Sequence, residues 1–291
     1  MIGSIKLFIK KIFPSTARSY LRRCKRHCLL FIKGARRKKT SLSKLRNILI
    51  DDLNLQKGDV IFVTSGFGYL NAEFTPYELI KLLQDIVTDE GIIMMPYYPP
   101  VNSEEWARSG QVFDMLRTRS GMGIMTNVFA QMPDVYMSLH PIKAVCVWGR
   151  NAEKIASNHN ISSTPFYWDS PYGKLLKIGC KTLGIGVANN PMFHSIEDVV
   201  SNPITKYYLP NKFRLKLKTK DENEIWVDTV VHNSTVLSKC ISSEAYIRTL
   251  NCNSYKKVDF GLSFIYFIDN TEVYDKVSVK VSNGETMLRQ R

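Results

Sequence analysis

The sequence predicts an α/β protein with a layered α/β/α core, a mostly parallel sheet and a C-terminal portion rich in antiparallel strands. Two buried-strand patterns, within residues 56–68 and over residues 92–98, flank an amphipathic helical pattern over residues 75–91. Strand, helix, strand is a βαβ unit, which indicates parallel strands in one sheet. From Lys206 onward, short runs alternate between apolar and polar residues, which is typical of antiparallel strands.

The first half of the chain carries clear helix boundaries. Residues 41–53 have a helical pattern that leads into the body. Thr75 is placed to cap the next helix, with Pro76 at its first position and Gly91 as its stop. Residues 99–123 are rich in Pro, Asn, Ser and Gly, and we expect a long functional loop there.

The remaining elements follow in alternation along the chain. Helices are predicted over residues 123–135, 151–159 and 170–179 and from residue 195, and strands over residues 144–148 and 181–187. The C-terminal antiparallel strands are predicted over residues 212–220, 224–231, 260–268 and 276–282.

The chain divides by charge into two parts. It has 291 residues, is 44% hydrophobic and carries a formal net charge of +14, and no apolar run is long enough to span a membrane. Residues 1–46 hold 15 of the 40 Lys and Arg and no Asp or Glu, so the rest of the chain, with 25 basic and 26 acidic residues, is nearly neutral. We expect a basic arm over residues 1–46 and a single domain over residues 47–291.

The arm has the pattern of a basic amphipathic helix. Ile5, Phe8 and Ile12 follow helical spacing with lysines between them, and Pro14 ends the run. This composition favours an anchor on an anionic membrane surface, hence a cytoplasmic protein that associates with the inner face of the membrane. A solubilising or partner-docking arm is the alternative. Nucleic-acid attraction is possible for clustered cations, but no reader fold surrounds them, so no specific nucleic-acid partner is expected.

The six cysteines form no C-x-x-C pair, so neither a zinc ribbon nor a dense disulfide framework is expected. Cys24, His27 and Cys28 lie close together, but no second ligand pair accompanies them. We therefore expect no metal and a reduced, cytosolic protein.

Four segments in one order carry a resemblance to a known family. They are GDVIFVTSGFGYL, the stretch from FDMLRTRSGMG to HPIKAVCVWG, SPYGKLLKIGCKTLGIGV and FHSIEDV. The G-x-S-x-G elbow, the Walker loop and H-E-x-x-H are missing. The series resembles the antibiotic N-acetyltransferase family, that of the aminoglycoside 3-N-acetyltransferases, over about residues 43–270.

The resemblance implies transfer of an acetyl group from acetyl-CoA to an amine on a sugar, with His194 and Glu197 as catalytic residues. An imidazole titrates near neutral pH and suits removal of a proton from the attacking amine. Glu197, one helical turn on, is expected to orient it. The alternative is a histidine at a helix N-terminus beside a solvated glutamate. His140, before Pro141, is expected to be a secondary site residue or a buried positioning histidine, with a purely structural role as the alternative.

The same resemblance implies where the substrates bind. Thr64, Ser65 and Gly66 follow the first strand and are expected to contact CoA through small side chains and backbone N–H groups, or else to form an ordinary turn. A second expected CoA wall consists of Ser120, Gly121 and Gly123. Asp169 and Ser170 are expected either to line the amine pocket or to cap the helix that follows.

The sequence leaves more than one candidate for the amine that accepts the acetyl group. Polycationic aminoglycosides require an acidic pocket, and only Glu104, Glu105 and Asp114 in the long loop supply nearby acids. With the basic arm, this favours an amino sugar of surface polysaccharide synthesis, with aminoglycoside resistance as the alternative. A third hypothesis is a basic membrane- or nucleic-acid-binding protein with an inactive enzyme body. His27, His159 and His232 are expected to be surface or structural residues.

Overall fold

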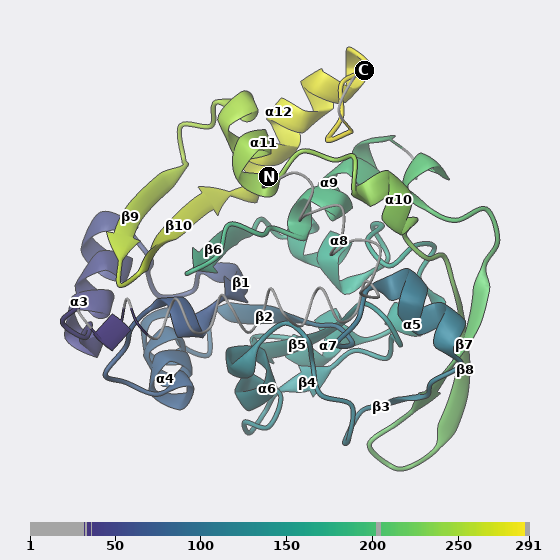
Figure 1. Cartoon of the computed structure of the whole chain (residues 1–291), viewed down its shortest axis with the longest axis horizontal. Coiled ribbons are helices and arrows are strands. Elements are labelled where there is room, and N and C mark those ends of the chain that lie inside the picture. The colour runs from purple at the N-terminus through teal and green to yellow at the C-terminus, as the bar shows by residue number, and fades with distance from the viewer. Residues whose placement is uncertain (1–31, 33, 36, 202–204, 289–291) are drawn as a thin grey trace, which may run out of the picture.

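The computed structural model describes residues 37–201 and 205–288, together with residues 32, 34 and 35 (Figure 1). Most of the basic arm, including its amphipathic pattern and the group of Cys24, His27 and Cys28, lies outside the described residues. Near the end of the arm, Thr40 bridges Ala72 and Leu45 is fully buried.

The elements alternate along the chain as the sequence predicts for an α/β protein. The main helices are α3 (Leu42–Asn47), α4 (Pro76–Val87), α5 (Ser103–Ser109), α6 (Ile124–Phe129), α7 (Ala152–Ala156), α8 (Pro171–Lys177), α9 (Met192–Ser201), α10 (Ser234–Leu237), α11 (Ser243–Leu250) and α12 (Asn270–Ser282). A π-helix η1 (Ile48–Asp52) continues α3, and short 3₁₀ turns are η2 (Phe67–Tyr69), η3 (His159–Ile161) and η4 (Thr205–Tyr207). The strands are β1 (Val60–Ser65), β2 (Ile92–Tyr97), β3 (Phe113–Asp114), β4 (Tyr136–Met137), β5 (Ala144–Gly149), β6 (Lys181–Ile185), β7 (Phe213–Lys218), β8 (Glu224–Thr229), β9 (Lys256–Phe260) and β10 (Ser263–Asp269).

A seven-stranded sheet in the order β4-β5-β2-β1-β6-β10-β9 forms the centre of the fold. The predicted βαβ unit is confirmed, since β1 pairs in parallel with β2 across α4, and β6 lies parallel on the other side of β1. The flanking strands β5, β4, β10 and β9 run antiparallel, as does the hairpin β7–β8, which forms a small second sheet with β3.

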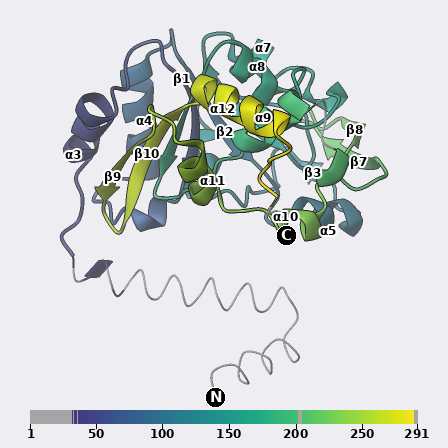
Figure 2. The same cartoon turned by 90° about the horizontal axis from the view of Figure 1, so that it is seen from above.

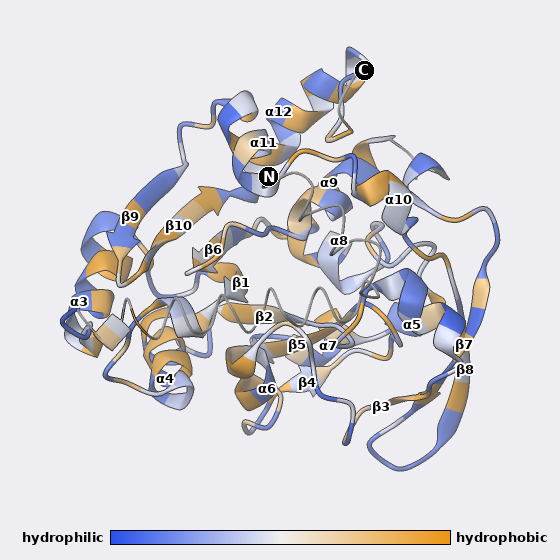
Figure 3. Cartoon of the chain, viewed as in Figure 1, coloured by the Kyte–Doolittle hydropathy of each residue, from blue (hydrophilic) through white to orange (hydrophobic). Residues whose placement is uncertain are grey.

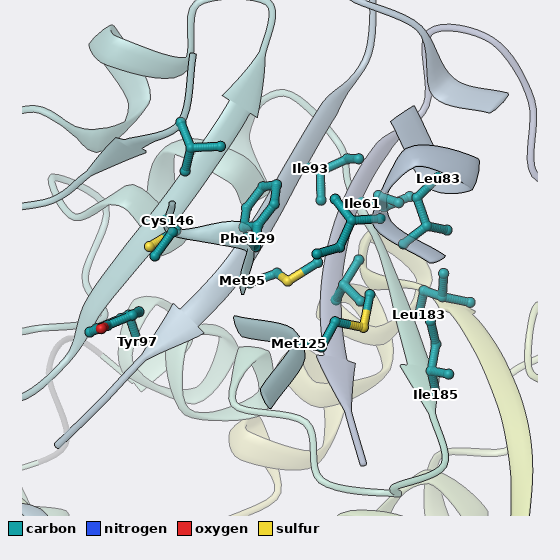
Figure 4. Packing of buried hydrophobic residues seen from close by; sticks show 14 of the residues in the cluster. Ile61, Leu83, Ile93, Met95, Tyr97, Met125, Phe129, Cys146, Leu183 and Ile185 are labelled. Atoms are coloured by element: carbon teal, nitrogen blue, oxygen red, sulfur yellow. The ribbon is translucent and has the colours of Figure 1, made fainter. Parts of the chain in front are cut away.

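Alternate side chains of the central strands enter two separate apolar clusters, one on each face of the sheet. Ile61 and Ile93 face the cluster under α4 and α6, where Phe129 also packs (Figure 4). Phe62 and Met94 face the opposite cluster, which α7 and α8 cover. The strands are therefore apolar on both faces, as a sheet between two helical layers requires.

A third apolar cluster fixes the C-terminal helices α11 and α12 beside α9, and Figure 2 shows these helices side by side. The edge strand β9 is hydrophilic, in contrast to the hydrophobic β10 (Figure 3), and its lysines protect the open edge from pairing. Within the part of the chain that the structure describes, no helix is long and apolar enough to cross a membrane.

Two local predictions were wrong. Residues 99–123 contain helix α5, which Asn102 caps by accepting a hydrogen bond from the Glu105 N–H. Residues 276–282 form the end of α12 instead of a strand. Val273 and Val277 are fully buried one helical turn apart, whereas Val279 is exposed, so burial at i, i+4 overrides the strand preference of the valines.

Gly184 in β6 provides a test of this packing. A Cβ at this position would lie 1.9 Å from the ring of Tyr266 on the paired strand β10, and that ring is buried and has no room to move. We expect Gly184→Ala to lower the free energy of unfolding by about 1–3 kcal/mol or more, as overpacking does. Chemical denaturation measures the loss. Gly68→Ala is the matched control, because no atom lies within 4 Å of its added Cβ; equal stability of the two variants would contradict the packing described.

Candidate active site

The candidate site lies where the parallel strands β1 and β6 end. In sheets of this type, the loops after the carboxyl ends of the strands collect functional groups. Ser65 ends β1 and Gly66 begins the loop after it, and the segment after β6 leads through Asn190 into α9, which carries His194. The two segments are joined, since Gly66 N–H donates to Ile185 O at 2.8 Å and Thr64 Oγ1 donates to Asn189 O at 2.9 Å.

The structure brings together the two loops predicted to contact CoA. A Cβ on Gly123, whose φ is +113°, would lie 3.4 Å from Ser65 O. Gly121 N–H donates to Tyr98 O, and a Cβ on Gly121 would lie 2.7 Å from Pro100 Cα. Both glycines therefore permit close backbone approach.

The two serine hydroxyls of these loops differ in their hydrogen bonds. Ser120 Oγ accepts from Met122 N–H, so this hydroxyl supports its own loop. Ser65 Oγ is buried and has no hydrogen-bond partner among the described residues. An unpaired buried hydroxyl is costly, which marks Ser65 as a group available to a ligand.

His194 occupies the first turn of α9, with a half-buried side chain. Its imidazole lies 5.8 Å from the ring of Phe166 and 4.9 Å from that of His232. Burial, together with the nearby positive charge of Lys143, lowers the pKa of His194 to about 4. Its Nδ1 is buried without a partner among the described residues, so the ring is neutral and has an unused nitrogen at neutral pH.

Lys143 follows the His140–Pro141 pair and places its ammonium among aromatic rings. Lys143 Nζ lies 4.3 Å from the centre of the Tyr98 ring and 5.7 Å from that of Phe166. Burial lowers the pKa of Lys143 to about 8, so it still carries a charge at neutral pH.

Glu197 does not make the expected contact with His194. Its carboxylate accepts hydrogen bonds from Tyr207 Oη at 2.6 Å, from Tyr246 Oη at 3.1 Å and from the Met287 N–H at 2.7 Å. Burial raises the pKa of Glu197, and these donors oppose that shift. Glu197 thus fixes α9 against the C-terminal segments, because its carboxylate is bonded to these three donors.

The next residue, Asp198, is a second buried carboxylate. Its Oδ2 accepts from Tyr208 Oη and, at 2.8 Å, from Thr164 Oγ1, while Oδ1 has no partner among the described residues. Burial raises the pKa of Asp198 to about 7. This residue joins α9 to the loop before α8 and to the segment after η4.

His140 is a buried positioning residue. Its Nδ1 accepts from the Lys143 N–H at 3.0 Å, so Nε2 carries the proton and donates to Thr229 Oγ1 at 3.1 Å. Burial lowers its pKa well below the ordinary value. His140 therefore shapes the turn that holds the Lys143 backbone, and its role in the site remains a prediction.

Asp169 and Ser170 serve the start of α8. Ser170 Oγ accepts from the Gly173 N–H, which makes it the N-cap, and it donates to Tyr167 O at 2.6 Å. Asp169 accepts from Ser163 N–H and Oγ. Only the Ser170 contacts are those of a helix cap, whereas Asp169 holds the loop before α8, and a role of either residue at the acceptor remains a prediction.

Comparison with known proteins gives the family. Residues 63–281 match the family described as aminoglycoside 3-N-acetyltransferase. The chain belongs to this family. A curated relative, the SPbeta prophage-derived aminoglycoside N(3')-acetyltransferase-like protein YokD of Bacillus subtilis (strain 168), is 28% identical over 159 residues. That match covers 47% of this chain and 57% of the relative, so it spans little more than half of the relative's length.

Solved structures of the aminoglycoside 3-N-acetyltransferase family share the fold. The YokD crystal structure has a TM-score of 0.62 at 21% identity, covering 80% of this chain and 90% of that one. AAC-IIIb, solved as a binary complex with CoASH, has a TM-score of 0.67 at 15% identity and covers 87% and 100%. Sisomicin-bound AAC-VIa has a TM-score of 0.68 at 17% identity and covers 86% and 100%.

One histidine of the site, His232, was not found from the sequence. His232, after β8, stacks between Phe166 at 5.3 Å and Tyr208 at 4.7 Å, and neither of its ring nitrogens has a partner among the described residues. His159 Nε2 donates to Pro165 O at 3.0 Å, so its Nδ1 accepts from Ser138 Oγ at 2.8 Å, and its ring centre lies 4.5 Å from that of His140. His159 is structural, as expected, whereas His232 lies beside His194 and extends the site. No local motif surrounds His232, because its proximity arises from the hairpin β7–β8.

No group of three or more His, Cys, Asp and Glu side chains with the geometry of a metal site occurs among residues 37–201 and 205–288. The described cysteines, Cys146, Cys180, Cys240 and Cys252, are free thiols.

Asp198 generates a prediction about pH. Because its pKa is about 7 in the folded chain and about 4 when unfolded, the folded chain binds the extra proton between these values. Protonated Asp198 therefore favours folding at low pH. This contribution to the free energy of unfolding, on the order of 2–4 kcal/mol, is lost as the pH rises from about 4 to about 7. Asp198→Asn removes this titration. We expect the melting temperature of the native chain to fall more steeply over this window than that of the variant, with Asp259→Asn, at an exposed carboxylate, retaining the native slope. Parallel profiles for the native chain and Asp198→Asn would refute this assignment.

Proposed function

We propose that this chain is an acetyl-CoA-dependent N-acetyltransferase that acts on an amino group of a sugar, with His194 as general base. The observation that carries the proposal is the neutral, half-buried imidazole of His194 on the helix that follows β6, in a chain of the aminoglycoside 3-N-acetyltransferase family. The lowered pKa leaves the ring free to accept a proton at neutral pH.

The reaction balances with the residues in place. The amine nitrogen attacks the thioester carbonyl of acetyl-CoA, a C–N bond forms, and the C–S bond then breaks. His194 accepts the proton that the amine loses, and the thiolate of CoA takes up a proton as it leaves. The backbone N–H of Gly123 is a candidate to stabilise the oxyanion that develops on the carbonyl oxygen, whereas the Gly66 N–H is already bonded to Ile185 O.

The loops fit CoA as a co-substrate. The unused Ser65 hydroxyl and the close backbone approach at Gly121 and Gly123 supply hydrogen-bonding groups without bulky side chains. AAC-IIIb, which shares this fold, binds CoASH in its crystal structure. Binding of CoA by Thr64, Ser65, Gly66, Ser120, Gly121 and Gly123 is part of the proposal.

The relatives favour aminoglycosides as the acceptor class, since YokD is described as aminoglycoside N(3')-acetyltransferase-like and AAC-VIa binds sisomicin. One observation keeps an amino sugar of polysaccharide synthesis as the second candidate. The acids of the loop over residues 99–123 are engaged with protein groups, Glu104 with Ser234 and Asp114 with Arg117, and do not form an acidic cluster.

The role of the basic arm is a separate proposal. Its 15 cations and absence of carboxylates support association with an anionic membrane surface on the cytoplasmic side. Deletion of residues 1–31 tests it by sedimentation with anionic and neutral vesicles. The third hypothesis, an inactive body on a basic binding arm, predicts no turnover at all.

His194→Ala tests the enzymatic proposal. We expect the native protein to release CoA from acetyl-CoA when an acceptor amine is present, and the variant to be about 10²–10⁴ times slower, the usual contribution of a general base. Thiol release with gentamicin, glucosamine and nucleotide-linked amino sugars as acceptors measures this.

Two controls complete the experiment. His159→Ala removes a histidine that bonds only to Ser138 and Pro165, so a loss equal to that of His194→Ala would indicate a general folding defect. Calorimetry with acetyl-CoA separates a missing acceptor from a missing activity. Undiminished turnover by His194→Ala would exclude the imidazole as the base.

A further inference from the structure

We propose that Lys143 selects the acceptor, and that its ammonium favours an amino sugar carrying an anionic group, such as a phosphate, over a polycationic one. This inference rests on the proposed function, because it concerns the acceptor of the same site. No residue role expected from the sequence involved Lys143.

The position of Lys143 puts a positive charge beside the proposed base. Its ammonium and the imidazole of His194 both lie within 6 Å of the Phe166 ring, at 5.7 and 5.8 Å from its centre. Tyr98, which follows β2, packs against the same ammonium and holds it there through its hydroxyl contact to the buried Tyr172. The His140 ring fixes the backbone of Lys143 from the other side. The lysine is therefore held in place and is not a mobile surface side chain.

No carboxylate compensates this charge. Among the described residues, Lys143 forms no ion pair, and the residues outside the described ranges contain no Asp or Glu. The buried carboxylates of α9, Glu197 and Asp198, accept hydrogen bonds from tyrosine hydroxyls and form no ion pair with Lys143. The two rings offer only the weaker attraction of their π faces. A half-buried cation without a counter-ion is costly, and a bound anion would remove that cost.

The charge has opposite consequences for two acceptor classes. In a partly desolvated site the interaction between charges is much stronger than in water, so an acceptor with several ammonium groups meets repulsion near His194. A phosphate or carboxylate on the acceptor supplies the missing counter-ion. Discrimination of this kind combines attraction of one class with exclusion of the other.

The direct test compares Lys143→Met, which removes the charge at similar length, with Lys143→Arg, which keeps it. The acceptors are glucosamine 6-phosphate, glucosamine and gentamicin, and thiol release gives kcat/KM for each. We expect the native protein to prefer the phosphorylated sugar over glucosamine by about tenfold or more, a factor that corresponds to about 1.4 kcal/mol. Lys143→Met should lose this preference and gain on gentamicin, and Lys143→Arg should retain it.

A second measurement does not depend on turnover. The charged and titratable groups that face His194 are Lys143, His232 and Tyr207. NMR titration of the His194 imidazole should give a higher pKa in Lys143→Met than in the native chain, because a neighbouring positive charge is removed. Inorganic phosphate should perturb the His194 resonance in the native chain and not in Lys143→Met.

The outcomes separate the two proposals. If the native chain acetylates an acceptor but Lys143→Met leaves the ratio between phosphorylated and cationic acceptors unchanged, the acceptor selection is wrong while the proposed function stands. If no acceptor turns over, the proposed function fails for these compounds, and the phosphate titration decides the charge selection by itself. An unchanged His194 pKa together with no phosphate effect would overturn it.

Discussion

The buried carboxylate of Glu197 is the interaction on which the candidate site depends. A carboxylate is costly to remove from water, and here three donors from three separate segments, Tyr207, Tyr246 and the Met287 N–H, replace its hydration. The helix that presents His194 is thereby fixed against η4, α11 and the C-terminal segment. Removing one partner of such a network leaves the others unsatisfied, so Glu197 holds α9, and with it the proposed base, in position.

His194 and the neighbouring histidines all have lowered pKa values. Burial lowers the pKa values of His140, His194 and His232, and Lys143 adds a positive charge that acts on all three in the same direction. The site therefore holds neutral rings and one cation. The ring nitrogens of His232 that lack partners among the described residues lie beside His194, which gives this pair hydrogen-bonding capacity that the protein itself does not use.

The sequence predicts the parts of this arrangement that depend on local pattern. The βαβ unit follows from apolar runs and from the Thr75–Glu78 capping box, and the position of His194 follows from the family motif. It does not predict contacts that form through the tertiary fold. The separation of Glu197 from His194 depends on tyrosines 10 and 49 residues away, and the approach of His232 depends on the hairpin β7–β8. The C-terminal valines alternate as in a strand, yet their burial against α9 makes them helical.

A base whose pKa is lowered to about 4 is a weak base for an ammonium, because proton transfer is most effective when the pKa of the base is near the working pH. The bound acceptor can correct this mismatch. An anionic group placed beside Lys143 would neutralise the charge that lowers the pKa of His194, so the basicity of the imidazole would rise when the acceptor is bound. A polycationic acceptor would act in the opposite direction and weaken the base further. The same lysine would then control both which acceptor binds and how well the bound acceptor is deprotonated, which makes kcat as well as KM sensitive to its charge.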